Sequence, residues 1–561
     1  MATFDYIVVI IYMTLMVGIG LYYHKYMKQI NTYYTAEGKI PWTIAALSLF
    51  MSSFSALVFV MYAGIGYRLG IVAVTLCWAT PPAFFIGAYI FSKRWKRAGI
   101  ITPVQFLETR YNFSVRQLIP VISIPLALVD NAMKVFALAV FVKNAFSISI
   151  ELSIITCGLI VGIYTFMGGL WAVTVTDVIQ FLVLASAVLA VLPLSMNEVG
   201  GITEFFRKTS DLHMLNPLGG KDISYLVVFL FLIMLSYNYR WSLVQRYYCV
   251  KDERSARRVG VVAGILFIIA PFMWALPAMA ARLILPGLEN PDYSYAALCV
   301  KILPVGMMGI VLSGMFAATM SMTAAEYNVN SSVFTVDIYK RWLHKTASDR
   351  TTMLVARIST FVMCLIVIAI GLIIAYWGKG LFDIMVAVFG VMLPPIAIPV
   401  LWGILFPKPY AKSALSAVII GLSTALIVKF YVIPQMKLTP DHAFVMSTLS
   451  GSIPTFLIML IGVFIEQPSA ESRVKVDEFF SKLRKPYEAK VISGTDKIPS
   501  PFPIVGLSSI CIGILLVIAT FFAKSNLHIV LDLGMGISLV LIGLALFVTS
   551  RRQLRKKAEA T

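Results

Sequence analysis

The chain has 561 residues, of which 59% are hydrophobic and only 13% are charged, and its formal net charge is +19. Soluble globular chains contain about 45–50% apolar and about 25% charged residues, so this composition excludes an ordinary soluble enzyme or binding domain. A bilayer can solvate so apolar a surface, and the sequence therefore predicts a membrane protein.

Apolar segments long enough to cross a bilayer recur along the whole chain. A hydrocarbon core of about 30 Å needs about 20 apolar residues in a helix, and about 15 segments meet this criterion. In chain order they are 4–26, 41–66, 70–95, 118–143, 150–167, 174–196, 223–247, 258–284, 301–335, 354–377, 382–406, 413–434, 442–465, 503–523 and 528–550. The predicted fold is an all-α polytopic membrane protein with about 15 transmembrane helices.

Lys and Arg residues are distributed unevenly between the two sides of the predicted membrane. With the N-terminus outside, roughly 33 lie in cytoplasmic segments and roughly 10 lie outside, as the positive-inside rule requires. The remaining three, Lys134, Arg240 and Lys429, are placed in the membrane. The sequence thus predicts a multi-pass protein of the plasma (cell inner) membrane, with its N-terminus outside and its C-terminus in the cytoplasm. This distribution explains the net charge without a nucleic acid partner.

Two predicted spans carry clusters of polar residues within an apolar helix. The second contains Ser48, Ser52, Ser53 and Ser55, and the seventh contains the run Ser-Tyr-Asn-Tyr-Arg at 236–240. Transporters often break their substrate helices at mid-membrane, although a serine can also bond back to its own helix. The two segments lie five spans apart. This spacing favours two five-helix repeats, and the odd repeat length gives them opposite orientations.

Charged residues inside other spans are functional hypotheses by default, because burying a charge in lipid is costly. The ninth span carries Glu326, and the sixth carries Asp177, although a helix N-terminus also favours a carboxylate. In the fourth span, Asp130 and Lys134 are four residues apart on one helical face. They form either a mutual ion pair or a site for a charged solute. Arg240 is open to two readings as well, because it lies about one and a half turns before Arg246 and its side chain can extend to the cytoplasmic interface.

Several motifs resemble those of one transporter family. The stretch 168–180 has a glycine pair, a threonine–aspartate pair and a glutamine, and it resembles the signature of the sodium:solute symporter family. The stretch 317–339 is similar to that family's sodium-site helix, and 64–70 (GIGYRLG) and Gln245-Arg246 also fit. The shared order of these motifs across about residues 1–465 carries the resemblance.

The resemblance implies a LeuT-like core with a 5+5 inverted repeat. On this basis 1–40 holds the first transmembrane helix and a cytoplasmic loop, 41–206 is the first repeat and 207–412 is the second. Two peripheral helices follow in 413–465, and 466–502 is a cytoplasmic linker with a short amphipathic helix around 476–483. The segment 503–561 is a C-terminal helix pair with a basic tail.

The resemblance also implies a sodium site between the second and ninth spans. The predicted sodium ligands are the backbone carbonyls of Met51, Phe54 and Ala318 and the hydroxyl of Ser321. Asp177 is predicted to lie beneath them, on the exit route of the ion. The family usually has a second hydroxyl directly after Ser321, where this chain has Met322, and a thioether is a poor ligand for a hard cation. Ala324 and Ala325 remove the hydroxyls of a second sodium site. We therefore expect at most one sodium ion, with proton coupling through Asp177 or Glu326 as the alternative.

The predicted substrate pocket departs from the sugar-transporting relatives. Positions where they place Gln, Glu, Asn and Lys are Val58, Cys77, Ile233 and Phe267 in this chain. The remaining polar candidates are Thr80, Ser236, Asn238, Asp130 and Lys134. A hexose held by many hydrogen bonds is not supported. Related anion-selective members place a basic residue in the fourth span, which favours a sugar acid or carboxylate over a neutral sugar or polyol.

The sequence thus predicts a sodium-coupled symporter of a small organic solute that works by alternating access. Its expected partners are the solute, the sodium ion and the lipid bilayer, in a monomer or loose homo-oligomer. No covalent cofactor is predicted, and the His-Glu-x-x-His and Gly-x-Ser-x-Gly motifs of enzymes are absent. Two alternatives stay open: a proton-coupled carrier of the same fold, and a transporter-like sensor, for which the tail after 550 is short.

Overall fold

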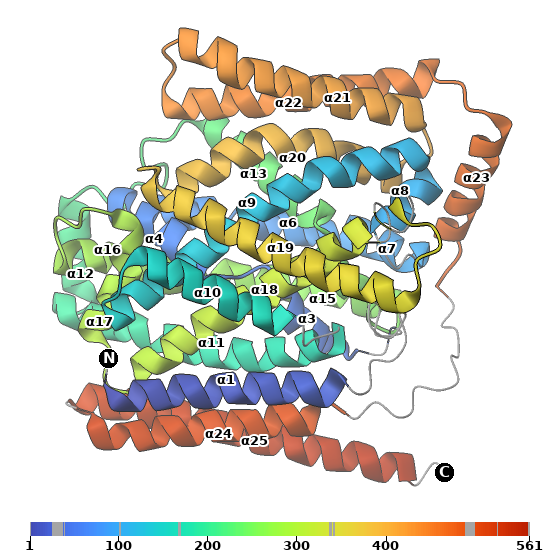
Figure 1. The fold of residues 1–561 in the computed structure, drawn as a ribbon. Coiled ribbons are helices and arrows are strands. Elements are labelled where there is room, and N and C mark those ends of the chain that lie inside the picture. The colour runs from blue at the N-terminus through green and yellow to red at the C-terminus, as the bar shows by residue number, and fades with distance from the viewer. Residues whose placement is uncertain are drawn as a thin grey trace.

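The computed structural model describes residues 2–24, 38, 40–99, 103–165, 170–335, 339, 343–487, 500–523 and 525–558. Within these ranges every regular element is a helix (Figure 1). The glycine pair at 168–169 of the family-like signature lies outside the described residues, as do 336–338 of the second motif. The all-helical class predicted from the sequence is confirmed.

The helices of the first half of the chain alternate between long spans and short pieces. They are α1 (Thr3–His24), α3 (Trp42–Met51), α4 (Ala56–Leu69), α5 (Val72–Cys77), α6 (Thr80–Ile86), η2 (Gly87–Phe91), α7 (Ser92–Ala98), α8 (Pro103–Arg110), α9 (Phe113–Phe146), α10 (Ile150–Thr165), α11 (Leu170–Val199) and α12 (Ile202–Asp211).

The second half continues in the same way. Its helices are α13 (Ile223–Tyr239), α14 (Trp241–Tyr248), α15 (Glu253–Ile269), α16 (Phe272–Ile284), η3 (Pro291–Tyr293), α17 (Ser294–Ile302), α18 (Met307–Ser332), α19 (Asp349–Tyr376), α20 (Leu381–Leu405), α21 (Ala411–Ile427), η5 (Val428–Val432), η6 (Ile433–Gln435), α22 (Pro440–Ile465), α23 (Ala470–Arg484), α24 (Phe502–Ala519), η7 (Thr520–Phe522) and α25 (Asn526–Ala558).

Twelve helices in the described ranges are long and apolar enough to cross a membrane, or up to 14 if each of two bent pairs is one span. The predicted span at 150–167 overlaps α10, whose described part ends at Thr165. With 12 to 14 candidate spans in the described ranges, the predicted number of about 15 is not confirmed.

The two bent pairs fall where the sequence placed its polar clusters. Helices α3 and α4 meet at 54° across residues 52–55, and α13 and α14 meet at 55° at Arg240. Arg240 itself has extended backbone (φ −66°, ψ 116°), so the helical hydrogen-bond pattern stops there. Backbone groups released at such breaks are available to ligands inside a membrane protein.

The bundle has a buried centre and two peripheral helix pairs. Helix α18 is buried throughout its membrane window. Figure 1 shows α21 and α22 at one edge and α24 and α25 at the opposite edge, beside α1. In the latter pair Gly513 and Gly536 face each other so closely that a Cβ on Gly513 would lie 2.6 Å from the Gly536 carbonyl oxygen. Small residues of this kind let membrane helices approach each other.

The N-terminal segment is anchored to α18. Asp5, which is only 2% exposed, accepts hydrogen bonds at Oδ1 from the backbone N–H groups of Gly306 (2.7 Å) and Gly309 (3.0 Å). These groups belong to the start of α18, where backbone donors lack partners within the helix and the dipole favours a carboxylate. Asp5 therefore fixes α1 to the N-terminal end of α18.

The linker helix α23 packs on α7 and α8. Its apolar residues Val476, Phe479 and Leu483 are buried, as expected for the predicted amphipathic helix. Arg97 of α7 forms a two-pronged ion pair with Glu253 of α15 (2.6 and 3.0 Å) and donates to the Leu483 carbonyl oxygen (2.9 Å). Glu253 also accepts from the Tyr487 N–H (3.0 Å). We call Arg97, Glu253, α23 and Tyr487 the linker clasp.

On the opposite side of the bundle, Asp292 of η3 joins α4 and α20. Its Oδ2 accepts a hydrogen bond from the Leu381 N–H (2.8 Å) at the start of α20, and its side chain leaves no room for a Cβ on Gly64 of α4. Burial raises the pKa of Asp292 to about 6, with Asp383 adding to the effect and Leu381 and Arg68 opposing it. Asp292 therefore holds a proton at pH values where an exposed aspartate has lost it.

We expect Asp292→Asn to remove one step from the pH dependence of stability. Because the folded-state pKa is raised above 3.8, this group's contribution is complete below about pH 4 and is lost as the pH rises through about 6. Asparagine keeps an acceptor for Leu381 but cannot ionise, so the variant should show a flatter profile. Thermal unfolding in detergent from pH 4 to pH 7 measures this, with the exposed Asp211→Asn, which does not act on Asp292, as control. Equal slopes in wild type and Asp292→Asn would contradict the assignment.

Candidate functional site

Asp177 joins four helices in the interior of the bundle. Its Oδ2 accepts a hydrogen bond from the Ser48 hydroxyl of α3 (2.5 Å), and its Oδ1 accepts one from the Ser321 hydroxyl of α18. Arg246 of α14 donates to Ser48 Oγ (3.1 Å) and brings Nη2 to 3.5 Å from Asp177 Oδ2. Both charged side chains are 0% exposed. This Asp177 cluster therefore fixes α3, α11, α14 and α18 relative to one another.

The break between α3 and α4 lies beside α18. Before the break, Ser48 and Ser321 share Asp177; after it, the Ala56 N–H donates to Thr319 Oγ1 of α18 (3.2 Å). The predicted sodium ligands Met51, Phe54 and Ala318 are all buried. The structure thus brings together the helix break and the helix from which the sodium site was predicted. Asp177 lies about two turns into α11, so its contacts are with side chains rather than the helix N-terminus.

Several buried hydroxyls have no hydrogen-bond partner among the described residues, and two of them lie in the break and on α18. These two are Ser52 Oγ in the break and Thr323 Oγ1 on α18. Buried hydroxyls nearly always have a partner, and a hard cation prefers oxygen ligands. Carbonyl groups at a helix break and hydroxyl oxygens without partners are the donor types that a sodium ion requires. Met322, at the family's usual hydroxyl position, instead lines a neighbouring cavity.

A cavity of about 90 Å³, which we call the central cavity, lies between the two broken helices and α9, α18 and α20. Its polar wall is formed by Ser53, Ser55, Tyr62, Ser236, Tyr237, Asp130, Lys134 and Arg240. Its apolar wall is formed by Leu57, Val58, Met61, Leu232, Ile233, Leu243, Met322, Met385 and Phe389. Pockets for drug-sized ligands have about 300–1,000 Å³, so the central cavity has room only for a small solute.

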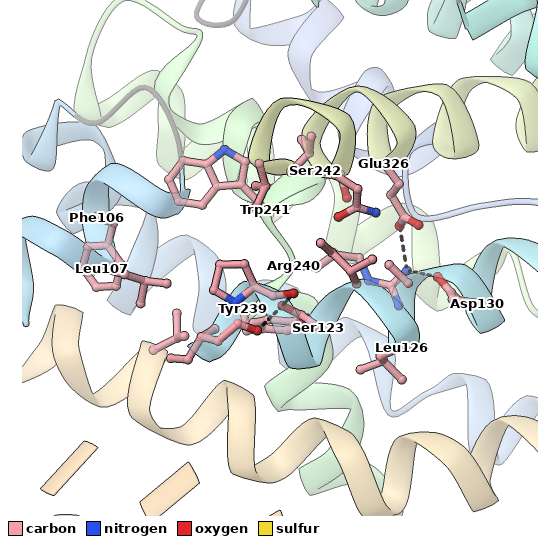
Figure 2. Close-up of a pocket in the computed structure, with 18 of the residues that line it drawn as sticks. Phe106, Leu107, Ser123, Leu126, Asp130, Tyr239, Arg240, Trp241, Ser242 and Glu326 are labelled. Atoms are coloured by element: carbon pink, nitrogen blue, oxygen red, sulfur yellow. Dashed lines mark hydrogen bonds and ion pairs between the residues drawn. The ribbon is translucent and has the colours of Figure 1, made fainter. Parts of the chain in front are cut away.

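Four charged side chains meet at one end of the central cavity. Lys134 Nζ lies 2.7 Å from Asp130 Oδ2 and 3.1 Å from Glu326 Oε2. Arg240 Nη1 lies 3.2 Å from Asp130 Oδ2 and 3.6 Å from Glu326 Oε1. Figure 2 shows Arg240 between Glu326 and Asp130. The side chains are between 1% and 19% exposed, so this charge network of two cations and two carboxylates is buried and has no net formal charge.

A second cavity, of about 120 Å³, also adjoins the charge network, and Figure 2 shows its lining. Its lining includes Phe106 and Leu107 of α8, which faces the cytoplasm in the predicted orientation, and we call it the inner cavity. Asp130 and Arg240 line both cavities, Lys134 lines only the central one, and Glu326 lines only the inner one. The charge network therefore separates the two cavities.

Aromatic side chains close the opposite end of the central cavity. Tyr62, in its wall, contacts Phe382 with ring centroids 5.9 Å apart, and Phe382 contacts Phe229 at 5.6 Å. The next residues of α20, Asp383 and Ile384, line a vestibule of about 800 Å³. The central cavity is thus bounded by aromatic rings on one side and by the charge network on the other.

The predicted substrate residues fall into two groups. Val58, Asp130, Lys134, Ile233 and Ser236 line the central cavity, whereas Cys77, Thr80, Asn238 and Phe267 do not. Asn238 donates to the carbonyl oxygens of Ala83 (3.1 Å) and Met234 (2.9 Å). Phe267 stacks on Phe84 with ring centroids 5.4 Å apart. These side chains are used in packing between α6, α13 and α15.

The sequence did not predict that Arg240 and Glu326 contact the pair Asp130 and Lys134. These residues belong to three segments that lie far apart in the chain, and no local spacing relates the segments. The available signal was that α9, the α13–α14 break and α18 each carry an intramembrane charge, and such charges tend to pair with one another. The same reasoning from Asp177 and the Gln245-Arg246 motif would have suggested the Arg246 pair.

Comparison with known proteins assigns the family. The model of the sodium:solute symporter family matches residues 33–421, which is well over half of the chain. The chain belongs to the sodium:solute symporter family. It is 28% identical over 465 residues to a sodium/glucose cotransporter of Vibrio parahaemolyticus, covering 76% of this chain and 85% of the relative. It is 26% identical to sodium/glucose cotransporter 2 of Rattus norvegicus, covering 75% and 71%.

Solved structures agree on the fold of this symporter. A sodium-coupled sialic acid symporter in its substrate-bound outward-open state matches with a TM-score of 0.72 at 22% identity, over 83% of this chain and 98% of the other. Mhp1, a nucleobase-cation-symport-1 family transporter, matches with a TM-score of 0.53 at 13% identity, over 80% and 98%. The protein is therefore a multi-pass transporter of the sodium-coupled solute symporter family and not an enzyme, as the sequence predicted.

Proposed function

We propose that this symporter carries a small organic carboxylate together with sodium, by alternating access through the central cavity. One observation supports the substrate class above the others. The charged groups that line the central cavity are two cations, Lys134 and Arg240, and one carboxylate, Asp130, so the lining has a net formal charge of +1. A monoanion neutralises this lining, whereas a neutral solute does not.

The rest of the cavity wall also favours a carboxylate over a sugar. Besides the charged groups, the polar atoms are five hydroxyls, on Ser53, Ser55, Tyr62, Ser236 and Tyr237, against nine apolar side chains. A hexose bound in an apolar wall would leave hydroxyls without partners, at about 1–3 kcal/mol each. A carboxylate with a short apolar body satisfies both parts of the wall. For this reason we do not propose glucose as the substrate of this chain, although the relatives named above are sodium/glucose cotransporters.

Sodium is the proposed coupling ion, at the break between α3 and α4. The proposed ligands are the carbonyls of Met51, Phe54 and Ala318 and the Ser321 hydroxyl, with Asp177 on the exit route. Thr323 is an additional oxygen donor, because its hydroxyl is buried without a partner among the described residues.

The architecture proposed for this cycle follows the sequence prediction. We propose inverted repeats at 41–206 and 207–412, with the N-terminus outside and the C-terminus in the cytoplasm of a plasma-membrane protein. The near-equal bends of α3–α4 (54°) and α13–α14 (55°), five predicted spans apart, support the repeat. The peripheral pairs 413–465 and 503–561 flank this core, joined by the linker 466–502. A monomer or loose homo-oligomer suffices, since both cavities lie within one chain.

Uptake into proteoliposomes tests the proposal. Labelled pyruvate, benzoate and gluconate are compared with glucose and myo-inositol under an inward sodium gradient. We expect sodium-dependent uptake of a carboxylate and at least about a tenfold loss in Lys134→Gln, because a buried charge-assisted hydrogen bond contributes about 1.5–3 kcal/mol. Lys429→Gln, at the other intramembrane lysine, is the matched control and should retain uptake. Lys134→Arg should recover part of it.

Other outcomes would contradict parts of this proposal. Uptake of glucose or myo-inositol with no uptake of carboxylates would replace the substrate class. Carboxylate uptake driven by a proton gradient and indifferent to sodium would indicate the proton-coupled carrier of the same fold. An equal loss in Lys134→Gln and Lys429→Gln would show that the charge network has no special part in binding.

A further inference from the structure

We infer that Glu326 is a built-in counter-anion: in the solute-free carrier it pairs with Lys134 and Arg240, the two cations that the carboxylate of the solute binds from the other side, and when displaced from them it takes up a proton. This inference rests on the proposed carboxylate function. It adds a proton to the binding step and assigns a specificity role to one residue.

The two carboxylates of the charge network are not equivalent. Asp130 lies one turn from Lys134 on α9, and its Oδ2 is 2.7 Å from Lys134 and 3.2 Å from Arg240. Glu326 reaches the same two cations from α18 at the longer distances of 3.1 and 3.6 Å. Coulomb attraction weakens with distance, so Glu326 is the more easily exchanged partner. Its displacement also breaks the ion pairs that α18 makes with α9 and with Arg240 at the α13–α14 break.

Glu326 and the solute approach the cations from opposite sides. The central cavity is lined by Lys134, Arg240 and Asp130, and the inner cavity by Arg240, Asp130 and Glu326. The charged lining therefore changes from net +1 to net −1 across the network. An anion bound in the central cavity is attracted to Lys134 and Arg240 but repelled from the inner cavity. Neutralising Glu326 brings the inner lining to zero and removes this barrier.

A displaced Glu326 has no other cation to bind among the described residues around it. The charged and titratable groups that face it are Asp130 and Lys134 of α9, Tyr239 and Arg240 at the α13–α14 junction, and its neighbour Tyr327 on α18. Once the solute holds Lys134 and Arg240, only the carboxylate Asp130 and two phenols remain. A buried carboxylate without a cation is so costly that the neutral form is favoured.

The charge balance of the exchange is simple. The network begins with two positive and two negative charges, and the incoming carboxylate adds one negative charge. One proton from water, taken up by Glu326, restores the balance, and no covalent bond other than O–H forms or breaks. Protein that binds a carboxylate should therefore remove about one proton per solute from solution.

Proton uptake is measured on the purified full-length protein in detergent, in weakly buffered sodium chloride at pH 7 with a pH indicator. The probe is benzoate adjusted to the same pH, and binding is followed separately by the rise in melting temperature. For wild type we expect saturable stabilisation and about one proton taken up per benzoate bound. For Glu326→Gln we expect stabilisation at equal or lower benzoate concentration and no proton uptake.

Two further variants separate this role from a structural one. Glu326→Asp keeps the ionisable group, and we expect it to retain proton uptake. Asp532→Asn removes another fully buried carboxylate, on α25, and should leave proton uptake unchanged. If Glu326→Gln does not fold, the proton uptake of wild type and of Glu326→Asp still tests the inference.

The outcomes distinguish this inference from the proposed function. Benzoate binding by wild type without proton uptake would overturn the counter-anion role and leave carboxylate symport standing. Proton uptake that persists in Glu326→Gln would also overturn it, because another group would then take the proton. If benzoate, pyruvate and gluconate all fail to stabilise wild type and Glu326→Gln, the carboxylate proposal and this inference both fail.

Discussion

Asp177→Asn is expected to abolish sodium-driven uptake and to lower the free energy of unfolding by about 3–5 kcal/mol. Asp177 and Arg246 are both 0% exposed, so removing the carboxylate leaves a buried guanidinium without a counter-charge. Asparagine has one acceptor oxygen, and the hydroxyls of Ser48 and Ser321 need two. The helix break and α18 would lose their shared anchor, and the proposed sodium site would lose its geometry.

Two measurements check this prediction. Thermal unfolding in sodium and in potassium chloride should show a sodium-specific stabilisation in wild type that is absent from Asp177→Asn and from Ser321→Ala. The double variant Asp177→Asn with Arg246→Gln should recover part of the stability, because no unpaired charge remains, but none of the sodium response. A sodium response that persists in Asp177→Asn would place the ion elsewhere.

Arg240→Gln is expected to stop transport and to destabilise the folded protein by about 3–5 kcal/mol, for a different reason. The substitution leaves Asp130 and Glu326 to share Lys134, so the network acquires a net negative charge in a buried place. Adding Glu326→Gln returns the network to one cation and one carboxylate. We expect this double variant to regain most of the stability and to remain inactive, since the central cavity then lacks its positive lining.

The comparison of these variants is a double-mutant cycle. Chemical or thermal unfolding of wild type, both single variants and the double variant gives a coupling free energy, which we expect to be about 1–3 kcal/mol. Additive effects would show that Arg240 and Glu326 do not interact in the protein in solution. Uptake of carboxylate by the double variant at the wild-type rate would remove Arg240 from the substrate site.

Sequence reasoning succeeded where the physical signal is local. Long apolar runs predicted most of the spans, and serines and the Ser-Tyr-Asn-Tyr-Arg run marked both helix breaks, because polar groups in lipid need a structural reason. The number of spans was not confirmed, since the described ranges contain 12 to 14 candidates against about 15 predicted. The short helices α12 and α17 lie largely between the long apolar runs and were not predicted.

The site shows the same division. Asp130 and Lys134 are one turn apart on α9, so their spacing could predict that they pair, and the ion pair is present at 2.7 Å. Their contacts with Arg240 and Glu326 depend on how three helices pack, which no spacing in the chain records. Alignment by position placed Asn238 and Phe267 near a substrate, but the direction of a side chain depends on its neighbours. The role of each predicted site residue stays a prediction until it is tested.

The linker clasp bears on speed rather than on selectivity. Its contacts join α7, the start of α15 and the chain after α23, and none of its residues lines the central cavity. A rearrangement that separates α7 from α15 must break the Arg97–Glu253 ion pair and affects the hydrogen bond from the Tyr487 N–H to Glu253, whichever solute is bound. Weakening the clasp would therefore change how many cycles the carrier completes each second while leaving its preference among solutes as it was.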